Sequence, residues 1–80
     1  MVKHKLKILP EFFELVITGE KRFEIRKNDR DFKQHDVLCL REWNPVTKKF
    51  TGNECTKYVR YIMYGGMYGL GKDYCIMSLE

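Results

Sequence analysis

The sequence predicts a small α+β domain that is mainly β, with about five strands and one helix after the first strand. Three observations support this class. Residues 4–9 alternate between polar and apolar, residues 10–19 carry apolar side chains at helical spacing, and four later segments have strand character and are separated by turn-forming residues. Because one helix cannot cover both faces of an open five-stranded sheet, we expect the sheet to curl or to close into a small barrel.

The first strand and the helix follow directly from local patterns. Leu6 and Ile8 alternate with lysines, which is typical of a half-buried strand. Pro10 suits the first position of a helix, and Gly19 suits its C-terminal cap. The helix is predicted to pack on the core through an apolar stripe formed by Phe12, Phe13, Leu15, Val16 and Ile17.

A second strand is predicted over residues 21–26, where charged and apolar residues alternate. We expect Phe23 and Ile25 to face the core, with Arg22, Glu24 and Arg26 on the opposite face. A polar turn follows at 27–31. Further strands are expected at 36–43, 54–64 and 73–79, joined by a polar connection at 44–53 and a glycine-rich loop at 65–72.

Length and composition indicate one domain over residues 1–80. The net charge of +4 suits weak attraction to phosphate. No apolar run approaches the length of a membrane span, and no signal peptide is evident, so we expect a cytoplasmic protein without membrane contact.

The cysteine and histidine pattern predicts neither disulfides nor a metal site. Three cysteines, an odd number, lie in apolar stretches without paired spacing, so we expect Cys39, Cys55 and Cys75 to be reduced, buried thiols. His4 and His35 are far apart in sequence and have no cysteine pair to join. The sequence predicts no metal and no other cofactor.

One apparent nucleotide motif is rejected. Residues 66–72 read G-x-x-x-x-G-K, but Asp73 stands where a phosphate-binding loop needs Ser or Thr, and no helix follows. We expect a hairpin loop that uses glycine for positive φ. The bare backbone from Gly65 to Gly71 remains a candidate wall of a ligand site.

The stretch GEKRFEIR carries a more specific pattern, G-x-K-x-x-E-x-R, formed by Gly19, Lys21, Glu24 and Arg26. With KNDRDF and the glycine loop, it resembles the ASCH domains of the PUA-like superfamily, in particular a short bacterial and phage branch, over nearly the whole chain. The resemblance implies a PUA-like β-barrel with a cleft between helix and barrel. It also implies an RNA or nucleotide-like ligand, with Lys21, Glu24 and Arg26 lining that cleft.

An enzymatic alternative comes from the same resemblance. Some ASCH members act as small amidohydrolases on acetylated cytidine, with a lysine, a threonine and a later acidic residue. Lys21 matches the lysine, Glu24 stands at the threonine position, and GGMYGLGKD replaces the segment that carries the acid. If this chain is an enzyme, Lys21 and Glu24 would serve as acid and base; a nucleophile with an adjacent base is not evident.

The residue types leave other interpretations open. Arg22, Glu24 and Arg26 could form a surface ion-pair ladder, and residues 27–31 could form a self-bonded turn. The leading hypothesis is a binding module for RNA or a nucleotide-like small molecule, and a charged face for a protein partner is a further one. The candidate ligand-binding residues are Lys21, Glu24, Arg26, Lys27, Arg30 and Arg41, and the candidate stacking residues are Trp43, Tyr64 and Tyr68.

Overall fold

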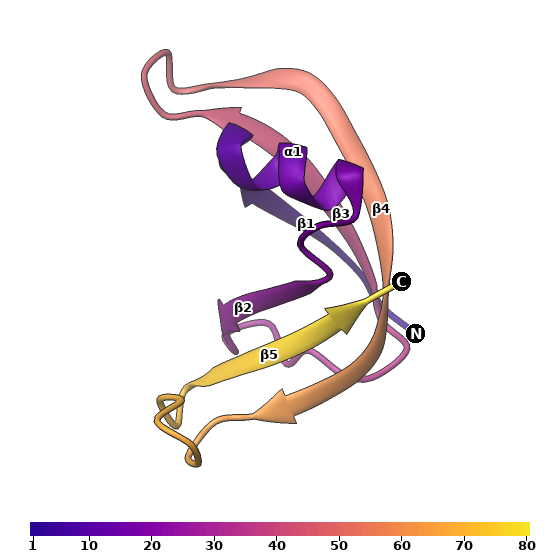
Figure 1. Cartoon of the computed structure of the whole chain (residues 1–80), viewed down its shortest axis with the longest axis vertical. Coiled ribbons are helices and arrows are strands. Elements are labelled where there is room, and N and C mark those ends of the chain that lie inside the picture. The colour runs from indigo at the N-terminus through magenta and orange to yellow at the C-terminus, as the bar shows by residue number, and fades with distance from the viewer.

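The computed structural model describes residues 1–80 as one curled five-stranded sheet and one helix (Figure 1). The elements are β1 Lys3–Ile8, α1 Pro10–Thr18, β2 Phe23–Lys27, β3 Val37–Asn44, β4 Lys49–Tyr64 and β5 Tyr74–Leu79. The strand order is β1-β3-β4-β5-β2. β1 runs parallel to β3, and every other neighbouring pair is antiparallel. The predicted mainly β class, with one helix after the first strand, is confirmed.

The curl of the sheet follows the course of β4. The first part of β4 pairs with β3 and its last part pairs with β5, with a register shift between Val59 and Tyr61. In Figure 1 the strand arches along one side of the molecule, with β3 and β1 beside its upper half and β5 and β2 beside its lower half. One strand therefore belongs to both halves of the sheet.

β4 begins earlier than the sequence predicted. It starts at Lys49, inside the segment 44–53 that we expected to be an irregular connection. Phe50 already pairs with Trp43, and the hairpin is closed by a short turn in which Lys48 has a φ of 55°. Gly52, with a φ of 97°, interrupts the alternation that would have indicated a strand here.

The sheet is not closed into a barrel. β1 and β2 are its two edges, and no backbone ladder joins them. Side chains bridge the gap instead: Arg26 on β2 donates to the carbonyl oxygen of Lys7, and Arg30, in the segment after β2, donates to that of Lys5 over 2.7 Å. These bonds occupy carbonyl groups that an edge strand otherwise leaves unpaired.

Helix α1 has the predicted ends but a narrower buried face. Pro10 is its first residue, and Gly19, with a φ of 82°, donates its N–H to Val16 at the C-terminus. Only Phe13 and Val16 are buried. Phe12 is 41% exposed, so it lies at the margin of the core rather than within it.

The two faces of β2 are reversed relative to the prediction. Phe23 and Ile25 are 42% and 49% exposed, whereas Glu24 is only 4% exposed. Two cations neutralise the buried carboxylate, so its burial is tolerated. The core lies on the concave side of the sheet and consists of Leu6, Ile8, Phe13, Val16, Phe32, Leu38, Leu40, Val59, Ile62, Cys75, Met77 and Leu79.

The three cysteines are free thiols. Cys39 and Cys75 are buried, and Cys55 is half-buried. Cys39 pairs with Thr56 and Cys55 with Leu40, so these two thiols lie on opposite faces of the sheet. Burial raises the pKa of Cys55 and of Cys75, which lowers the fraction of reactive thiolate at neutral pH.

The glycine-rich segment between β4 and β5 is a compact loop, as predicted. Gly65 donates its N–H to the carbonyl oxygen of Tyr74 and closes the loop. A side chain at position 65 would collide with the backbone of Gly71, because an added Cβ would lie 1.8 Å from its carbonyl oxygen. Gly66 and Gly69 have positive φ angles of 100° and 80°.

Candidate functional site

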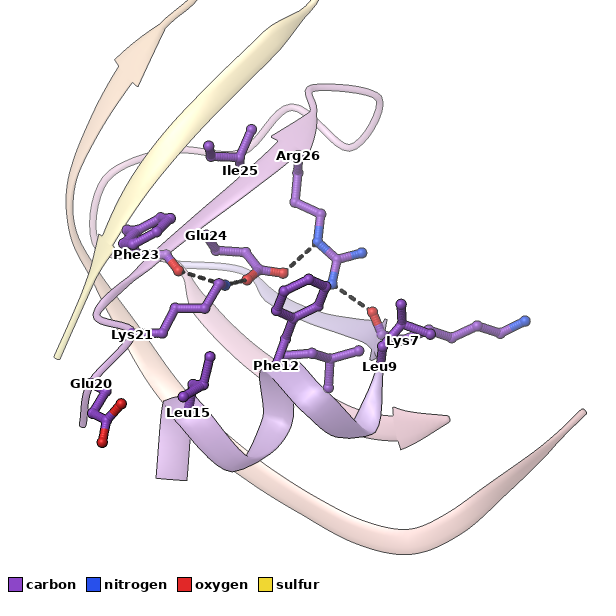
Figure 2. Close-up of a pocket in the computed structure, with 11 residues that line it drawn as sticks. Lys7, Leu9, Phe12, Leu15, Glu20, Lys21, Phe23, Glu24, Ile25 and Arg26 are labelled. Atoms are coloured by element: carbon purple, nitrogen blue, oxygen red, sulfur yellow. Dashed lines mark hydrogen bonds and ion pairs between the residues drawn. The ribbon is translucent and has the colours of Figure 1, made fainter. Parts of the chain in front are cut away.

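A cleft of about 680 Å³ opens between α1, the end of β1 and the edge strand β2 (Figure 2). Its apolar lining consists of Ile8, Leu9, Phe12, Leu15, Phe23 and Ile25. Its charged lining consists of Lys7, Glu20, Lys21, Glu24 and Arg26. Ligand pockets in proteins commonly enclose about 300–1,000 Å³ with mostly apolar walls and a few polar groups, and this cleft has both properties.

The polar groups are concentrated around Glu24. Lys21 Nζ lies 2.7 Å from Glu24 Oε1, and Arg26 Nε lies 2.7 Å from Glu24 Oε2. The side chains are 15%, 25% and 6% exposed for Lys21, Arg26 and Glu24, respectively. These three residues of the G-x-K-x-x-E-x-R pattern form one connected group, which we call the Glu24 triad. Figure 2 shows them in a row along one side of the cleft.

The backbone places the Glu24 triad without strain. Glu24 and Arg26 are two residues apart on β2, so both side chains point to the same face. Lys21 lies in the turn between α1 and β2, where its N–H donates to the carbonyl oxygen of Leu15 over 3.0 Å. Its ammonium reaches forward to Glu24 and also donates to the carbonyl oxygen of Phe23 over 2.9 Å.

The Glu24 triad offers hydrogen-bond donors rather than acceptors. An ammonium has three N–H donors, and Lys21 directs hydrogen bonds to two protein oxygens. Arg26 uses Nε for Glu24 and Nη2 for the carbonyl oxygen of Lys7, which leaves its Nη1 group without a protein partner. Two cations and one carboxylate give a net charge of +1. The group is therefore suited to a carbonyl oxygen or an anion.

Two phenylalanine rings flank the Lys21 ammonium. Its Nζ lies 5.7 Å from the ring centroid of Phe12 and 5.0 Å from that of Phe23. Both distances are within the range of a cation–π contact. Both rings remain partly exposed and line the cleft, so they offer apolar surface beside the donors.

The open edge of β2 also lies along the cleft. On either side of β2, the carbonyl oxygen of Arg22 and the N–H of Asn28 form hydrogen bonds with the β5 side. Because backbone groups alternate in direction along a strand, the even-numbered residues between them also face β5. The groups of Phe23 and Ile25 point to the unpaired edge by the same alternation, and both residues line the cleft. Ile25 there presents one donor and one acceptor without strand partners.

The remaining predicted residues fall into two groups. The first group lies beside the outer side of β1, near Lys7, and consists of Arg30, Arg41 and Trp43. Lys7 Nζ is 3.9 Å from the Trp43 ring centroid. Lys27 is exposed and lies outside the cleft. The two tyrosines and the glycine loop also lie outside it.

The two tyrosines differ in their surroundings. Tyr64 donates its hydroxyl to the carbonyl oxygen of Phe32 over 2.9 Å, which ties β4 to the segment before β3. Tyr68 stands at the tip of the glycine loop and is 91% exposed.

The sequence reasoning missed the apolar walls. Phe12 was assigned to the core together with Phe13, although adjacent helical residues point about 100° apart. That angle was the available signal, because two neighbouring aromatic rings cannot both occupy the centre of one buried stripe. Lys7 was missed because its backbone carbonyl, rather than its side chain, faces Arg26 (Figure 2).

No group of three or more His, Cys, Asp or Glu side chains is arranged to hold a metal ion. The single helix is too short to cross a membrane.

Comparison with known proteins identifies the family. The model of the family described as "Domain of unknown function (DUF3850)" matches residues 3–79, so the chain belongs to this family. A similar protein is the "Uncharacterized 12.9 kDa protein in GpA 3'region" of Escherichia phage P2, which is 43% identical over 51 residues. The match covers 64% of this chain and 45% of the phage protein, so the chain spans less than half the length of that relative.

Proposed function

We propose that this member of the DUF3850 family binds RNA or a nucleotide-like ligand in the cleft beside α1. The observation that carries the proposal is the Glu24 triad, a buried carboxylate that holds two cations on one side of an apolar cleft. Such an arrangement orients hydrogen-bond donors toward a ligand and keeps them fixed before the ligand arrives.

A nucleobase matches this chemistry. Proteins recognise unstacked bases through stacking on aromatic side chains and hydrogen bonds to base edges. Phe12 and Phe23 supply exposed ring surface, and Lys21 and Arg26 supply donors for a base carbonyl oxygen. The backbone edge at Ile25 adds one donor and one acceptor. Glu24 serves to hold the two cations, because both of its oxygens already accept hydrogen bonds.

The relation to ASCH and other PUA-like domains is part of this proposal. The motif residues Lys21, Glu24 and Arg26 converge on a cleft between helix and sheet, which is the arrangement that the resemblance implied. The open sheet edge departs from a closed PUA-like barrel. We propose a distant relation in which the gap between β1 and β2 is bridged by arginine side chains.

The amidohydrolase alternative receives less support from the same contacts. A lysine that acts as a base must present a free nitrogen lone pair to the substrate, but Lys21 Nζ already donates to Glu24 over 2.7 Å and to the carbonyl oxygen of Phe23 over 2.9 Å. We therefore expect little release of cytidine from N4-acetylcytidine. Robust hydrolysis by the native protein, abolished in both Lys21→Ala and Glu24→Gln, would replace the binding proposal with the enzymatic one.

The binding proposal is tested with fluorescently labelled, mixed-sequence single-stranded hexaribonucleotides at low salt. Phe12→Ala should weaken binding about tenfold, because stacking on an aromatic side chain contributes about 1–3 kcal/mol per base. Tyr61→Ala is the matched control, since Tyr61 is an exposed aromatic residue outside the cleft. Glu24→Gln should also weaken binding by releasing the two cations from their fixed positions.

Two results would contradict the proposal. One is the absence of binding to any oligonucleotide by the native protein. The other is an equal loss of affinity in Phe12→Ala and Tyr61→Ala. Circular dichroism and urea unfolding of each variant separate a loss of binding from a loss of folding, since Phe12 is partly exposed at the margin of the core and its truncation should leave the fold intact.

A further inference from the structure

A second cavity lies on the other side of β1 and has a different character. Its volume is about 370 Å³, and its lining includes Lys5, Lys7, Arg26, Arg30, Arg41 and Phe50. Five of the seven lining residues are cationic, and the lining contains no carboxylate. We call this cavity the basic groove. Its positive charge contrasts with the mainly apolar lining of the cleft beside α1.

The cations of the basic groove are held in place by contacts that leave their charges largely uncompensated. Arg30 donates to the backbone of Lys5 over 2.7 Å, and a carbonyl oxygen carries no formal charge. The carboxylate nearest to Arg41 is Glu54, at 3.7 Å, and more than half of its side chain is exposed. Arg26 forms an ion pair with Glu24, but that carboxylate is shared with Lys21. The groove therefore attracts anions.

Aromatic rings fix two of these cations. Lys7 Nζ lies 3.9 Å from the Trp43 ring centroid, and Arg41 Cζ lies 3.9 Å from the Phe50 ring centroid. The two rings contact each other edge to face with centroids 4.9 Å apart. Cations held over rings lose less side-chain entropy when an anion binds. Phe50 is also 38% exposed, so the pair that it forms with Arg41 lies at the surface of the groove.

The two cavities meet at Arg26 and Lys7, which line both. Arg26 donates from Nε to Glu24 on the cleft side and from Nη2 to the carbonyl oxygen of Lys7 at the edge of β1. In Figure 2 the Lys7 side chain extends away from the cleft while its carbonyl faces Arg26. The cleft and the basic groove therefore adjoin at Arg26 and Lys7.

We infer that the ligand is a single-stranded oligonucleotide rather than a free nucleotide, with one base in the cleft and the adjoining phosphates in the basic groove. This inference rests on the proposed function, because it needs a nucleobase in the cleft. A free nucleotide would leave most of the groove cations unused. A strand of several nucleotides places anionic groups along Lys5, Arg30 and Arg41 at the same time.

The number of phosphate contacts determines how steeply the affinity for the strand falls with salt concentration. Each phosphate contact to a single strand contributes about −0.7 to the slope of log affinity against log salt concentration. Two or three contacts in the basic groove thus give a slope of roughly −1.4 to −2. Uridine monophosphate reaches the groove with one phosphate at most, so its slope should be shallower.

The experiment compares a labelled mixed-sequence hexaribonucleotide with uridine monophosphate as probes. In Lys5→Gln/Arg41→Gln the hexamer should bind about tenfold more weakly and its salt slope should become shallower by about 1.4. The affinity for the monophosphate should fall less, because the monophosphate brings one phosphate to the groove at most. The matched control is Arg60→Gln/Lys72→Gln, which removes the same charge from exposed residues outside both cavities. This control should retain nearly native affinity and slope.

The outcomes separate the inference from the proposed function. Equal losses in the groove variant and the control variant would overturn the inference and indicate general charge attraction. Equal affinity of the native protein for hexamer and monophosphate would also overturn it, while leaving a nucleotide site in the cleft. Binding of neither probe would contradict the proposed function and, with it, the inference. Both double variants are checked for native circular dichroism before titration.

Discussion

At the residue scale, two buried carboxylates, Glu24 and Asp36, are stabilised by different kinds of partner. Glu24 is neutralised by Lys21 and Arg26, which approach from the open side of the sheet and keep spare donors for a ligand. Asp36 is satisfied by His4 at 2.8 Å and by the N–H groups of Val2 and Lys33. Its partners belong to the structure itself, so Asp36 is a stabilising residue.

Asp36 leads to a prediction about acid stability. Burial raises its pKa, but the hydrogen bonds from His4 and from the two backbone N–H groups outweigh burial, and the pKa is lowered overall. A carboxyl group with a depressed pKa stabilises the fold above its unfolded value of about 3.9, and this stabilisation is lost as the pH falls through the folded value. Asp36→Asn should cost about 1–3 kcal/mol near neutral pH.

The measurement is urea unfolding near neutral pH and at about pH 3 for the native protein, Asp36→Asn and Asp31→Asn. The gap between the native protein and Asp36→Asn should narrow in acid, because below the unfolded pKa of about 3.9 the unfolded state takes up a proton that the folded carboxylate resists. Asp31, whose side chain is 80% exposed, serves as the control and should show little effect at either pH. A gap that stays constant with pH would show that Asp36 acts without its charge.

At the element scale, β2 shows how much the sequence could predict and where it failed. The strand, its bounds to within about two residues and the shared face of Glu24 and Arg26 follow from alternation. Which face is buried does not follow, because alternation is symmetrical and hydrophobicity favoured Phe23 and Ile25. The missing information was that Glu24 is paired with Lys21, three residues away, and with Arg26, because these two cations allow the carboxylate to be buried.

Because the faces of β2 are reversed, we expect the fold to tolerate truncation of Ile25. Ile25→Ala should destabilise the protein by no more than about 1 kcal/mol, because half of the side chain is already exposed and the remaining cost is strand propensity. Ile62→Ala is the matched control on β4. Ile62 is only 7% exposed, so its truncation should cost about 2–5 kcal/mol.

Equilibrium urea unfolding of the two variants decides between the two orientations of β2. Comparable losses at positions 25 and 62 would mean that Ile25 is buried in solution. That result would also place Glu24 on the outer face and remove the Glu24 triad from the cleft.

At the scale of the whole molecule, the candidate site depends on the curled sheet being open between its edge strands, β1 and β2. Five strands and one helix were predictable from composition and alternation, because each of these patterns is local in sequence. The open gap between β1 and β2 was not predictable in this way. It depends on contacts from Arg26 and Arg30 to carbonyl oxygens 19 and 25 residues away in sequence. The basic groove lies at this gap, so Arg26, Arg30 and Arg41 were predicted only as separate candidates, and Lys5 and Lys7 were not among them.

The bridge between the two edges gives the last prediction. Arg30→Ala removes the hydrogen bond to the carbonyl oxygen of Lys5 without touching the core or the ladder between β1 and β3. An intramolecular hydrogen bond contributes about 0.5–1.5 kcal/mol, so local opening of β1 should increase roughly two- to tenfold. Amide hydrogen exchange by NMR should show this increase at the β1 and β3 amides that pair with each other, while the β4–β5 ladder stays protected.

The control is Arg22→Ala. It removes a hydrogen bond of similar length, 2.9 Å to the carbonyl oxygen of Gly19, that does not bridge the two edges. Faster exchange in both variants alike, or unchanged exchange in Arg30→Ala, would show that the arginine bridge does not hold the open edges of the sheet.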